Sequence, residues 1–354
     1  MRRLFCVSTL SIVLALTTFF LLFLSAPAKS ASSEKPIVLT LNLPIPPVHT
    51  RWQNALKPWC DEIARRTNNR VEIKPYFAQA LSTMAENYDS VVKGVADMGE
   101  CAIGLKPGRL PATEQMMYFC RPSITLNKPS QMMMKMYREL PELRNEFKEA
   151  KVLFLHMSGN MGFGTSKKKI NKIEDVKGLK MNVVGSGLLM DKFKALGFST
   201  VFMPMADIYM ALEKGVVEGT HVSYDLCISR RWGDIIKHIV PITMNTPNFY
   251  MAMNQKKWAS LPPDIQQVFE EMSGDPAALK FDEYWETAEL AAKKKWETEI
   301  GGVTTILPRE EMEKIDQLIV PVISKFVEDS GKKGLKLEKV YQRFIELEKE
   351  YAMR

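Results

Sequence analysis

Few residues in this chain have the types and spacing that acid–base or metal chemistry requires. Four histidines occur, far apart in the sequence: His49, His156, His221 and His238. No H-E-x-x-H or similar pair of ligands one helical turn apart is present, so nothing in the spacing indicates a zinc site.

Two glycine motifs resemble catalytic signatures, but each lacks a residue that the signature requires. The segment Gly159–Gly164 has the glycine spacing of a phosphate-binding loop, but Thr165 stands where the lysine is required. The turn Gly185–Gly187 contains Ser186 but lacks the outer glycines of a nucleophile elbow. We therefore expect a protein that is not an enzyme and that binds neither a metal ion nor a cofactor.

The cysteines leave the redox state open. Four follow the N-terminal leader: Cys60, Cys101, Cys120 and Cys227. None forms a C-x-x-C pair, which argues against a zinc or redox motif. An oxidising compartment would permit a disulfide, with Cys101 and Cys120 the closest pair in sequence, and four free thiols are the alternative.

The first 28 residues predict export. Arg2 and Arg3 precede an almost wholly apolar stretch, Leu4–Leu24, and Ala26 and Ala28 then form an A-x-A cleavage site. This order of positive, apolar and small residues is typical of a secretory signal peptide. We expect cleavage after Ala28 and a periplasmic mature protein. An uncleaved anchor is the alternative, because the apolar stretch approaches the roughly 20 residues of a membrane helix.

The composition is that of a globular chain. Hydrophobic residues make up 46% and charged residues 25%, as in ordinary folded domains. The net charge is +7, but basic and acidic residues are interleaved, so we expect no nucleic-acid partner. The mature chain exceeds the size at which a single core stops growing, which predicts two lobes. We expect the protein to be a monomer.

Hydrophobic periodicity predicts alternating strands and helices. Predicted strands cover 37–43, 70–74, 152–156, 179–184, 200–203 and 249–253, and predicted helices cover 52–66, 83–95, 188–196 and 207–214. Such alternation indicates mostly parallel sheets. Ligands of such sheets bind beyond the carboxyl ends of the strands, so in a chain of two lobes we expect the site in the cleft between them.

The last third of the chain is predicted to be mainly helical. Residues 276–296 can form a single long helix, and 318–326 and 337–351 two more. Pro321 is expected to kink or delay the first of these two helices. Residues 303–307 are predicted to form a short strand.

Four segments carry a family resemblance. Pro107–Pro111 is similar to a P-G-x-F-P turn, with leucine for phenylalanine, and Glu174–Met181 to a D-L-K-G-x-K segment. Ile208–Gly219 is similar to Y-x-A-L-x-x-G-V-V-D-G, and Met253–Pro262 to M-N-x-x-x-W-x-x-L-P. Together, in this order, they resemble the periplasmic solute-binding proteins of TRAP transporters, of the dicarboxylate-binding type.

The resemblance implies a receptor that captures a small organic metabolite and delivers it to the membrane subunits of a secondary transporter. It also implies a two-lobed α/β periplasmic-binding-protein fold, with mixed, mostly parallel sheets and a long inter-lobe helix. Lobe I would comprise 36–158 and 248–287, including the start of that helix. Lobe II would comprise 159–247 and 288–354, including the C-terminal helices. A ligand-sensing module for a receptor kinase and a periplasmic enzyme are the alternatives.

The chain departs from the family where the ligand is usually held. Most members have an arginine in the strand after D-L-K-G-x-K, which pairs with the ligand carboxylate; here that position is Asn182. An amide can donate and accept hydrogen bonds but carries no charge. A second family arginine, upstream near Gly159–Gly164, is also missing, and Glu218 replaces the usual aspartate, with His221 close behind.

These departures lead to two hypotheses about the ligand. In the first, which we place slightly ahead, the ligand is neutral or polar and is held by Asn182, Glu218 or His221 beside aromatic walls. In the second, the ligand is an atypical organic acid, and another cation, such as Arg51 or Arg121, replaces the family arginine.

Five further residues complete the predicted ligand site: Tyr224, Phe249, Tyr250, His49 and Glu100. A structural role is the alternative for each of them. The three aromatic residues can equally well pack in a core. His49, directly after a proline turn, can be an exposed loop residue, and Glu100 can be a solvated acid at the end of a strand.

Overall fold

The computed structural model describes residues 35–183, 185 and 187–352. The predicted signal peptide, its cleavage site and Ser186 lie outside the described residues. The chain divides into two units, Met1–Ile37 and Val38–Arg354, and nearly all described residues belong to the second. No helix in the described part of the chain is long and apolar enough to cross a membrane.

The first sheet has five strands in the order β2-β1-β3-β10-β4. Their bounds are β1 Ile37–Asn42, β2 Val71–Tyr76, β3 Met98–Ala102, β4 Ala150–Met157 and β10 Asn248–Asn254. Strand β3 runs parallel to β1, whereas β10 is antiparallel to both of its neighbours, β3 and β4. Every residue of β10 is buried, so this strand is covered on both faces.

The second sheet has six strands in the order β11-β9-β5-β8-β6-β7. Their bounds are β5 Met161–Thr165, β6 Lys180–Asn182, β7 Ser199–Val201, β8 Gly219–Val222, β9 His238–Asn245 and β11 Val303–Thr304. Strand β6 is parallel to β7 and β8, and β5 is antiparallel to β8 and β9. Both sheets are therefore mixed, which confirms the two-lobed α/β fold class.

The chain passes directly from one sheet to the other at two points. Strand β4 leads into β5 through residues 158–160, and β9 leads into β10 through residues 246–247. The two crossings are joined by a hydrogen bond of 2.9 Å from the backbone N–H of Ser158 to the carbonyl of Pro247. Each sheet is thus built from segments that are discontinuous in sequence. The exact lobe boundaries stay a prediction.

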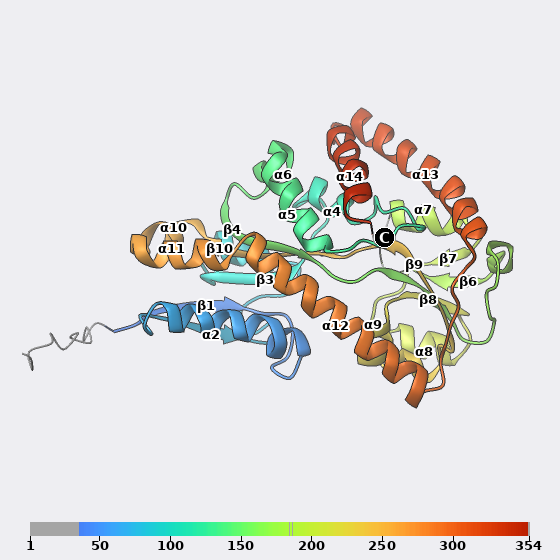
Figure 1. The fold of residues 1–354 in the computed structure, drawn as a ribbon, viewed down its shortest axis with the longest axis horizontal. Coiled ribbons are helices and arrows are strands. Elements are labelled where there is room, and N and C mark those ends of the chain that lie inside the picture. Colours follow the sequence, from blue (N-terminus) through green and yellow to red (C-terminus); the bar gives the residue numbers. More distant parts are fainter. Residues whose placement is uncertain (1–34, 184, 186, 353–354) are drawn as a thin grey trace, which may run out of the picture. The chain divides into compact units, whose positions relative to one another are not determined.

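Helix α12, Asp275–Glu299, is the long helix expected at 276–296. It begins after Gly274, whose φ of 61° suits a residue without a side chain, and has a proline in its first turn. Helix α12 packs against β4 of the first sheet and against α9, Tyr224–Ser229, which follows β8 of the second (Figure 1). It therefore contacts a strand of the first sheet and a helix that follows a strand of the second.

The predicted helix 52–66 starts with an irregular turn. Residues Trp52–Leu56 form a π-helical segment, η1, and only then does α2 continue over Lys57–Arg66. Turns of this kind are frequent at functional sites, because the wider winding displaces a side chain from its regular position. Arg51 is the residue that precedes η1.

The prediction for 318–326 was wrong in extent. Helix α13 runs over Arg309–Lys332, with Pro321 inside it. A proline removes one backbone hydrogen bond, but Ile315, Ile319, Ile323 and Val327 repeat every four residues and are all buried. This continuous apolar face, packed on α7 (Leu188–Ala195), outweighs the missing bond.

The remaining helices connect the strands or cover the sheets. They are α3 Asn87–Val92, α4 Pro111–Met116, α5 Pro129–Glu139, α6 Pro141–Glu146, α8 Ile208–Glu213, α10 Gln255–Ser260, α11 Pro263–Met272 and α14 Glu338–Glu350. Helix α3 is shorter than the predicted 83–95, and both Met84 and Val95 are exposed. Helix α14 packs on α4 and α5, which lie in the sequence between β3 and β4 of the first sheet. All four cysteines among the described residues are free and buried.

Candidate functional site

Arg51 is a nearly buried cation with an unusual environment. The residue is only 6% exposed. Its Nε lies 3.3 Å from Oε1 of Glu100, but that nitrogen has no hydrogen bond of good geometry. The other guanidinium nitrogens make no hydrogen bond to any described residue either. A guanidinium carries five N–H donors, and buried polar groups are nearly always paired. Arg51 therefore has donor capacity that the described protein does not use.

Aromatic rings hold the guanidinium in place. Its Cζ lies 4.7 Å from the ring centroid of Phe249 on β10 and 5.8 Å from that of Trp285 on α12. Such cation–π contacts stabilise an arginine away from water. The backbone is fixed as well, because the N–H of Arg51 donates to Nδ1 of His49 over 3.1 Å.

Glu100 is the counter-ion, and it is held from behind by His156. Both side chains are fully buried. The Nε1–H of Trp285 donates to Nδ1 of His156 over 3.2 Å, so the imidazole proton resides on Nε2, which lies 3.2 Å from Oε1 of Glu100. The His156 ring also stacks on Phe249, with centroids 4.8 Å apart. A continuous set of contacts thus runs from Trp285 through His156 and Glu100 to Arg51.

The pKa values of this set are consistent with one fixed ion pair and neutral imidazoles. Burial alone would raise the pKa of Glu100, but the charge of Arg51 and the hydrogen bond from His156 hold it below its ordinary value. Burial lowers the pKa of His156 to about 4, and burial with the charge of Arg51 does the same for His49. At neutral pH, Arg51 and Glu100 are charged and both imidazoles are uncharged.

Helix α12 brings α9 to the same place. Trp285 and Glu289 are one turn apart and lie on the same face of α12. The Glu289 carboxylate accepts hydrogen bonds from the backbone N–H groups of Tyr224, over 3.0 Å, and Asp225, over 3.3 Å. Burial, and then the charge of Asp225, raises the pKa of Glu289 to about 7. The first turn of α9 is thereby fixed beside the part of α12 that contacts Arg51.

Asn182 has a different environment, although it was the first residue predicted to bind the ligand. It is fully buried at the end of β6. Its Nδ2 donates to Oγ1 of Thr220 over 3.0 Å, and its Oδ1 accepts from the N–H of Met203 over 3.0 Å. Each end of the amide is bonded to the protein, as the alternative structural role requires.

His221 lies on β8 and Glu218 directly precedes that strand, but neither side chain joins Arg51. Glu218 is exposed just before the strand, where its Oε2 accepts from the N–H of Lys180 over 3.0 Å. His221 is fully buried, and neither ring nitrogen makes a hydrogen bond of good geometry. Burial lowers the pKa of His221 to about 4, opposed by the side chain of Asn245.

The two predicted tyrosines point elsewhere. The hydroxyl group of Tyr224 shares a hydrogen bond of 2.8 Å with Thr304. Tyr250 follows Phe249 on β10, so its side chain is on the opposite face of the strand, and its hydroxyl donates to Oδ1 of Asn87 over 2.9 Å.

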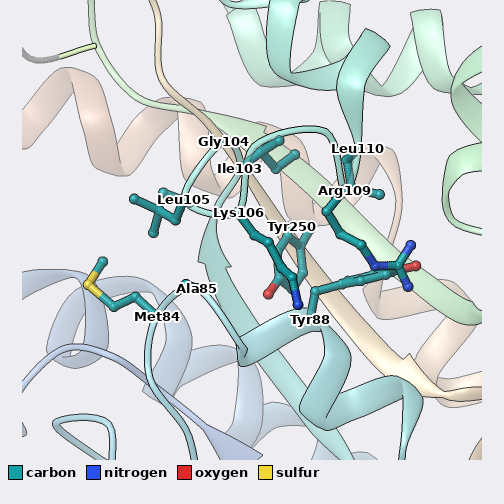
Figure 2. Close-up of a pocket in the computed structure, with 11 residues that line it drawn as sticks. Met84, Ala85, Tyr88, Ile103, Gly104, Leu105, Lys106, Arg109, Leu110 and Tyr250 are labelled. Carbon is teal, nitrogen blue, oxygen red and sulfur yellow. The ribbon is translucent and has the colours of Figure 1, made fainter. Parts of the chain in front are cut away.

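Tyr250 instead lines a small surface pocket beside α3 (Figure 2). The pocket volume is about 20 Å³, room for a single water-sized group. Lys106 and Arg109 line it, and both pair with Asp89. The full lining is Met84, Ala85, Tyr88, Ala102, Ile103, Gly104, Leu105, Lys106, Arg109, Leu110 and Tyr250.

The structure thus brings together three predicted residues, His49, Glu100 and Phe249, around Arg51. No hydrogen bond, ion pair or ring contact among the described residues joins that group to the side chains of Asn182, Glu218, His221, Tyr224 or Tyr250. Of the two alternative cations, Arg121 is bound to Glu348 of α14, with its Nε 2.6 Å from Oε2. Sequence reasoning missed Trp285, Asp225 and the role of His156. The described residues contain no group of His, Cys, Asp and Glu side chains that could hold a metal ion.

Comparison with known protein sequences identifies solute-binding proteins as relatives of this chain. The family model of the bacterial extracellular solute-binding proteins, family 7, matches residues 45–330. A solute-binding protein of Verminephrobacter eiseniae is 23% identical over 295 residues, which are 79% of this chain and 82% of that protein. The C4-dicarboxylate-binding periplasmic protein DctP of Vibrio cholerae is 24% identical over 157 residues, 44% of this chain and 47% of that protein.

Solved structures share the fold. A marine metagenome TRAP solute-binding protein specific for aromatic acid ligands, in complex with 3-hydroxybenzoate, superposes with a TM-score of 0.80 at 21% identity, covering 90% of this chain and 99% of that one. A TRAP solute-binding protein from Rhodoferax ferrireducens, in complex with copurified benzoate, has a TM-score of 0.78 at 23% identity, covering 89% and 98%.

Proposed function

We propose that this chain, which belongs to family 7 of the bacterial extracellular solute-binding proteins, the receptors of TRAP transporters, captures a small organic acid through Arg51. In this role the protein binds its ligand outside the cytoplasm and delivers it unchanged to the membrane subunits of the transporter. The observation that carries the proposal is a single one: a nearly buried guanidinium that donates no hydrogen bond to any described residue.

A carboxylate is the group that best complements this guanidinium. The planar fork of an arginine matches the two oxygens of a carboxylate, and two parallel charge-assisted hydrogen bonds are stronger than neutral ones. Glu100 offsets the charge of Arg51 but contacts it at 3.3 Å, without a good hydrogen bond. Because Asn182 is already bonded at both ends, we favour the replacement of the family arginine by Arg51 over a neutral ligand.

Aromatic neighbours make an aromatic or otherwise flat acid a reasonable first candidate. Phe249 and Trp285 flank the guanidinium, and flat rings pack well against such side chains. The two structural neighbours named above were solved with benzoate and 3-hydroxybenzoate. These compounds are therefore suitable first probes, although similarity at this level of identity concerns the fold.

Mass spectrometry of the ligand released from the purified protein tests this proposal. We expect an organic acid that is present in the wild-type preparation, absent from Arg51→Ala, and retained by the matched control Arg121→Ala, since Arg121 is already paired. The same acid should be recovered unaltered after prolonged incubation with the protein. A neutral ligand, or an acid retained equally by Arg51→Ala, would contradict the proposal.

A further inference from the structure

Arg51 and the backbone of Asp225 contact two neighbouring side chains of α12. Arg51 lies over Trp285, with its Cζ 5.8 Å from the ring centroid. The backbone N–H of Asp225 donates to Oε1 of Glu289 over 3.3 Å. Trp285 and Glu289 are four residues apart on one helix, so their side chains are neighbours. The guanidinium and the carboxyl-bearing first turn of α9 therefore flank a single turn of α12.

The two charged groups interact but do not touch. No ion pair of 4.0 Å or less joins them, and the Asp225 carboxylate accepts no hydrogen bond from any described residue. The charge of Arg51 nevertheless acts on Asp225. Burial raises the pKa of the Asp225 carboxyl group, and the positive charges of Arg51 and Arg230 oppose that rise. Tyr284, whose hydroxyl shares a hydrogen bond of 2.9 Å with Thr50, lies near the same two groups.

Two other polar side chains around this place, Glu289 and His156, already have partners. Glu289 binds the start of α9, and His156 is held between Trp285 and Glu100. The second oxygen of Glu100 is fully buried, with no hydrogen-bond partner, so the protein encloses it. Arg51 thus offers free donors here, and the Asp225 carboxylate offers a free acceptor.

We propose that Asp225 is a specificity-determining residue, which accepts a hydrogen bond from a hydroxyl or ammonium group of the same ligand whose carboxylate binds Arg51. The inference rests on the proposed function, because it takes Arg51 as the anchor of the acid. It assigns the ligand to a narrower class: small hydroxy acids or amino acids, rather than simple carboxylic acids or dicarboxylates. A dicarboxylate is disfavoured because its second negative charge would face Asp225.

The test compares acids that differ only by the donor. Titration calorimetry would measure the wild-type protein with benzoate, the three hydroxybenzoates, mandelate, and propionate against lactate and alanine. For at least one pair, the donor-bearing acid should bind about tenfold or more tightly than its parent, as expected for a hydrogen bond to a charged group. In Asp225→Ala this preference should fall to about threefold or less, while the affinity for the parent acid changes little.

Two controls make the outcome decisive. Asp234→Ala removes an exposed acid that pairs with Arg231 near the end of α9, and it should keep the preference. If Asp225→Ala does not fold, the isosteric Asp225→Asn should selectively weaken the amino acid. An unchanged preference in a folded Asp225 variant overturns this inference but leaves the proposed function intact. Acid binding that survives in Arg51→Ala, or no binding of any acid to the wild-type protein, overturns the proposed function and this inference with it.

Discussion

Two buried cations in this chain differ in how their charge is stabilised. Lys192 on α7 is fully buried, and its Nζ donates to three backbone carbonyls: Tyr118 at 3.1 Å, Cys120 at 2.9 Å and Met244 at 2.6 Å. Arg51 is almost as buried, but its guanidinium donates no hydrogen bond to a described residue. An ammonium has three protons, so Lys192 is saturated and Arg51 is not.

The comparison distinguishes buried polar side chains with a structural role from those with a functional role. A buried charge whose donors are all used stabilises the fold and has nothing left for a ligand. A buried charge held only by one carboxylate and by aromatic rings keeps its hydrogen-bonding capacity at the expense of stability. Asn182, whose amide is bonded at both ends, resembles Lys192 more than Arg51, whereas Asp225 resembles Arg51. Among these four side chains, unused hydrogen bonds distinguish the two kinds of site better than burial or charge alone.

The largest stability effect should come from Lys192→Met. The substitution leaves three buried carbonyls without a donor, and we expect the free energy of unfolding to fall by about 3–5 kcal/mol. Urea denaturation followed by circular dichroism measures this. The affinity of the folded variant for its ligand should stay within about threefold, and a loss of binding comparable to that of Arg51→Ala would abolish the distinction between the two cations.

Glu289 should make the stability of the Arg51 region depend on pH. Burial and Asp225 raise its pKa from 4.5 to about 7, so the folded protein binds this proton more tightly than the unfolded chain does. The unfolding free energy should therefore decrease as the pH rises from about 4.5 through 7, by up to about 3 kcal/mol. In Glu289→Gln this contribution is absent, so the difference between the two proteins isolates it. Parallel slopes in denaturation series from pH 4.5 to 8 would contradict the assignment.

A smaller effect is expected for Asn182→Ala. The change removes the partners of Thr220 and of the Met203 N–H, and we expect a loss of about 2 kcal/mol in unfolding free energy. Ligand affinity should stay within about fivefold. Glu218→Gln is the matched control just before the neighbouring strand: its side chain is exposed, and its substitution should change stability by less than about 0.5 kcal/mol. A large loss of affinity in Asn182→Ala would restore the neutral-ligand hypothesis.

The fold was largely predictable because local patterns encode it. Period-two and helical repeats located most of the strands and the long helix α12, whose buried residues follow one face. The predicted delay of the helix at Pro321 was wrong because it considered one missing hydrogen bond and not the buried face that runs from Ile315 to Val327. The ends of α3 were wrong for a similar reason: Met84 and Val95 are apolar but exposed.

The candidate site was less predictable because it depends on distant partners. Nothing near Asn182 in the sequence indicates that Thr220 and Met203 would bond both ends of its amide. Arg51 could be named as an alternative cation, but its unused donors follow from contacts with Glu100, Phe249 and Trp285, which are 49 or more positions away. The π-helical turn after Arg51 leaves no clear mark in the sequence either.

The most direct test is a calorimetric titration of the acid released from the wild-type protein onto Arg51→Ala and Asn182→Ala in parallel. The account predicts that Arg51→Ala weakens binding by about 100-fold or more, the equivalent of about 2.7 kcal/mol, while Asn182→Ala stays within about fivefold of the wild type. The reverse order, with Asn182→Ala the weaker binder, would contradict the claim that the unpaired guanidinium of Arg51 holds the ligand.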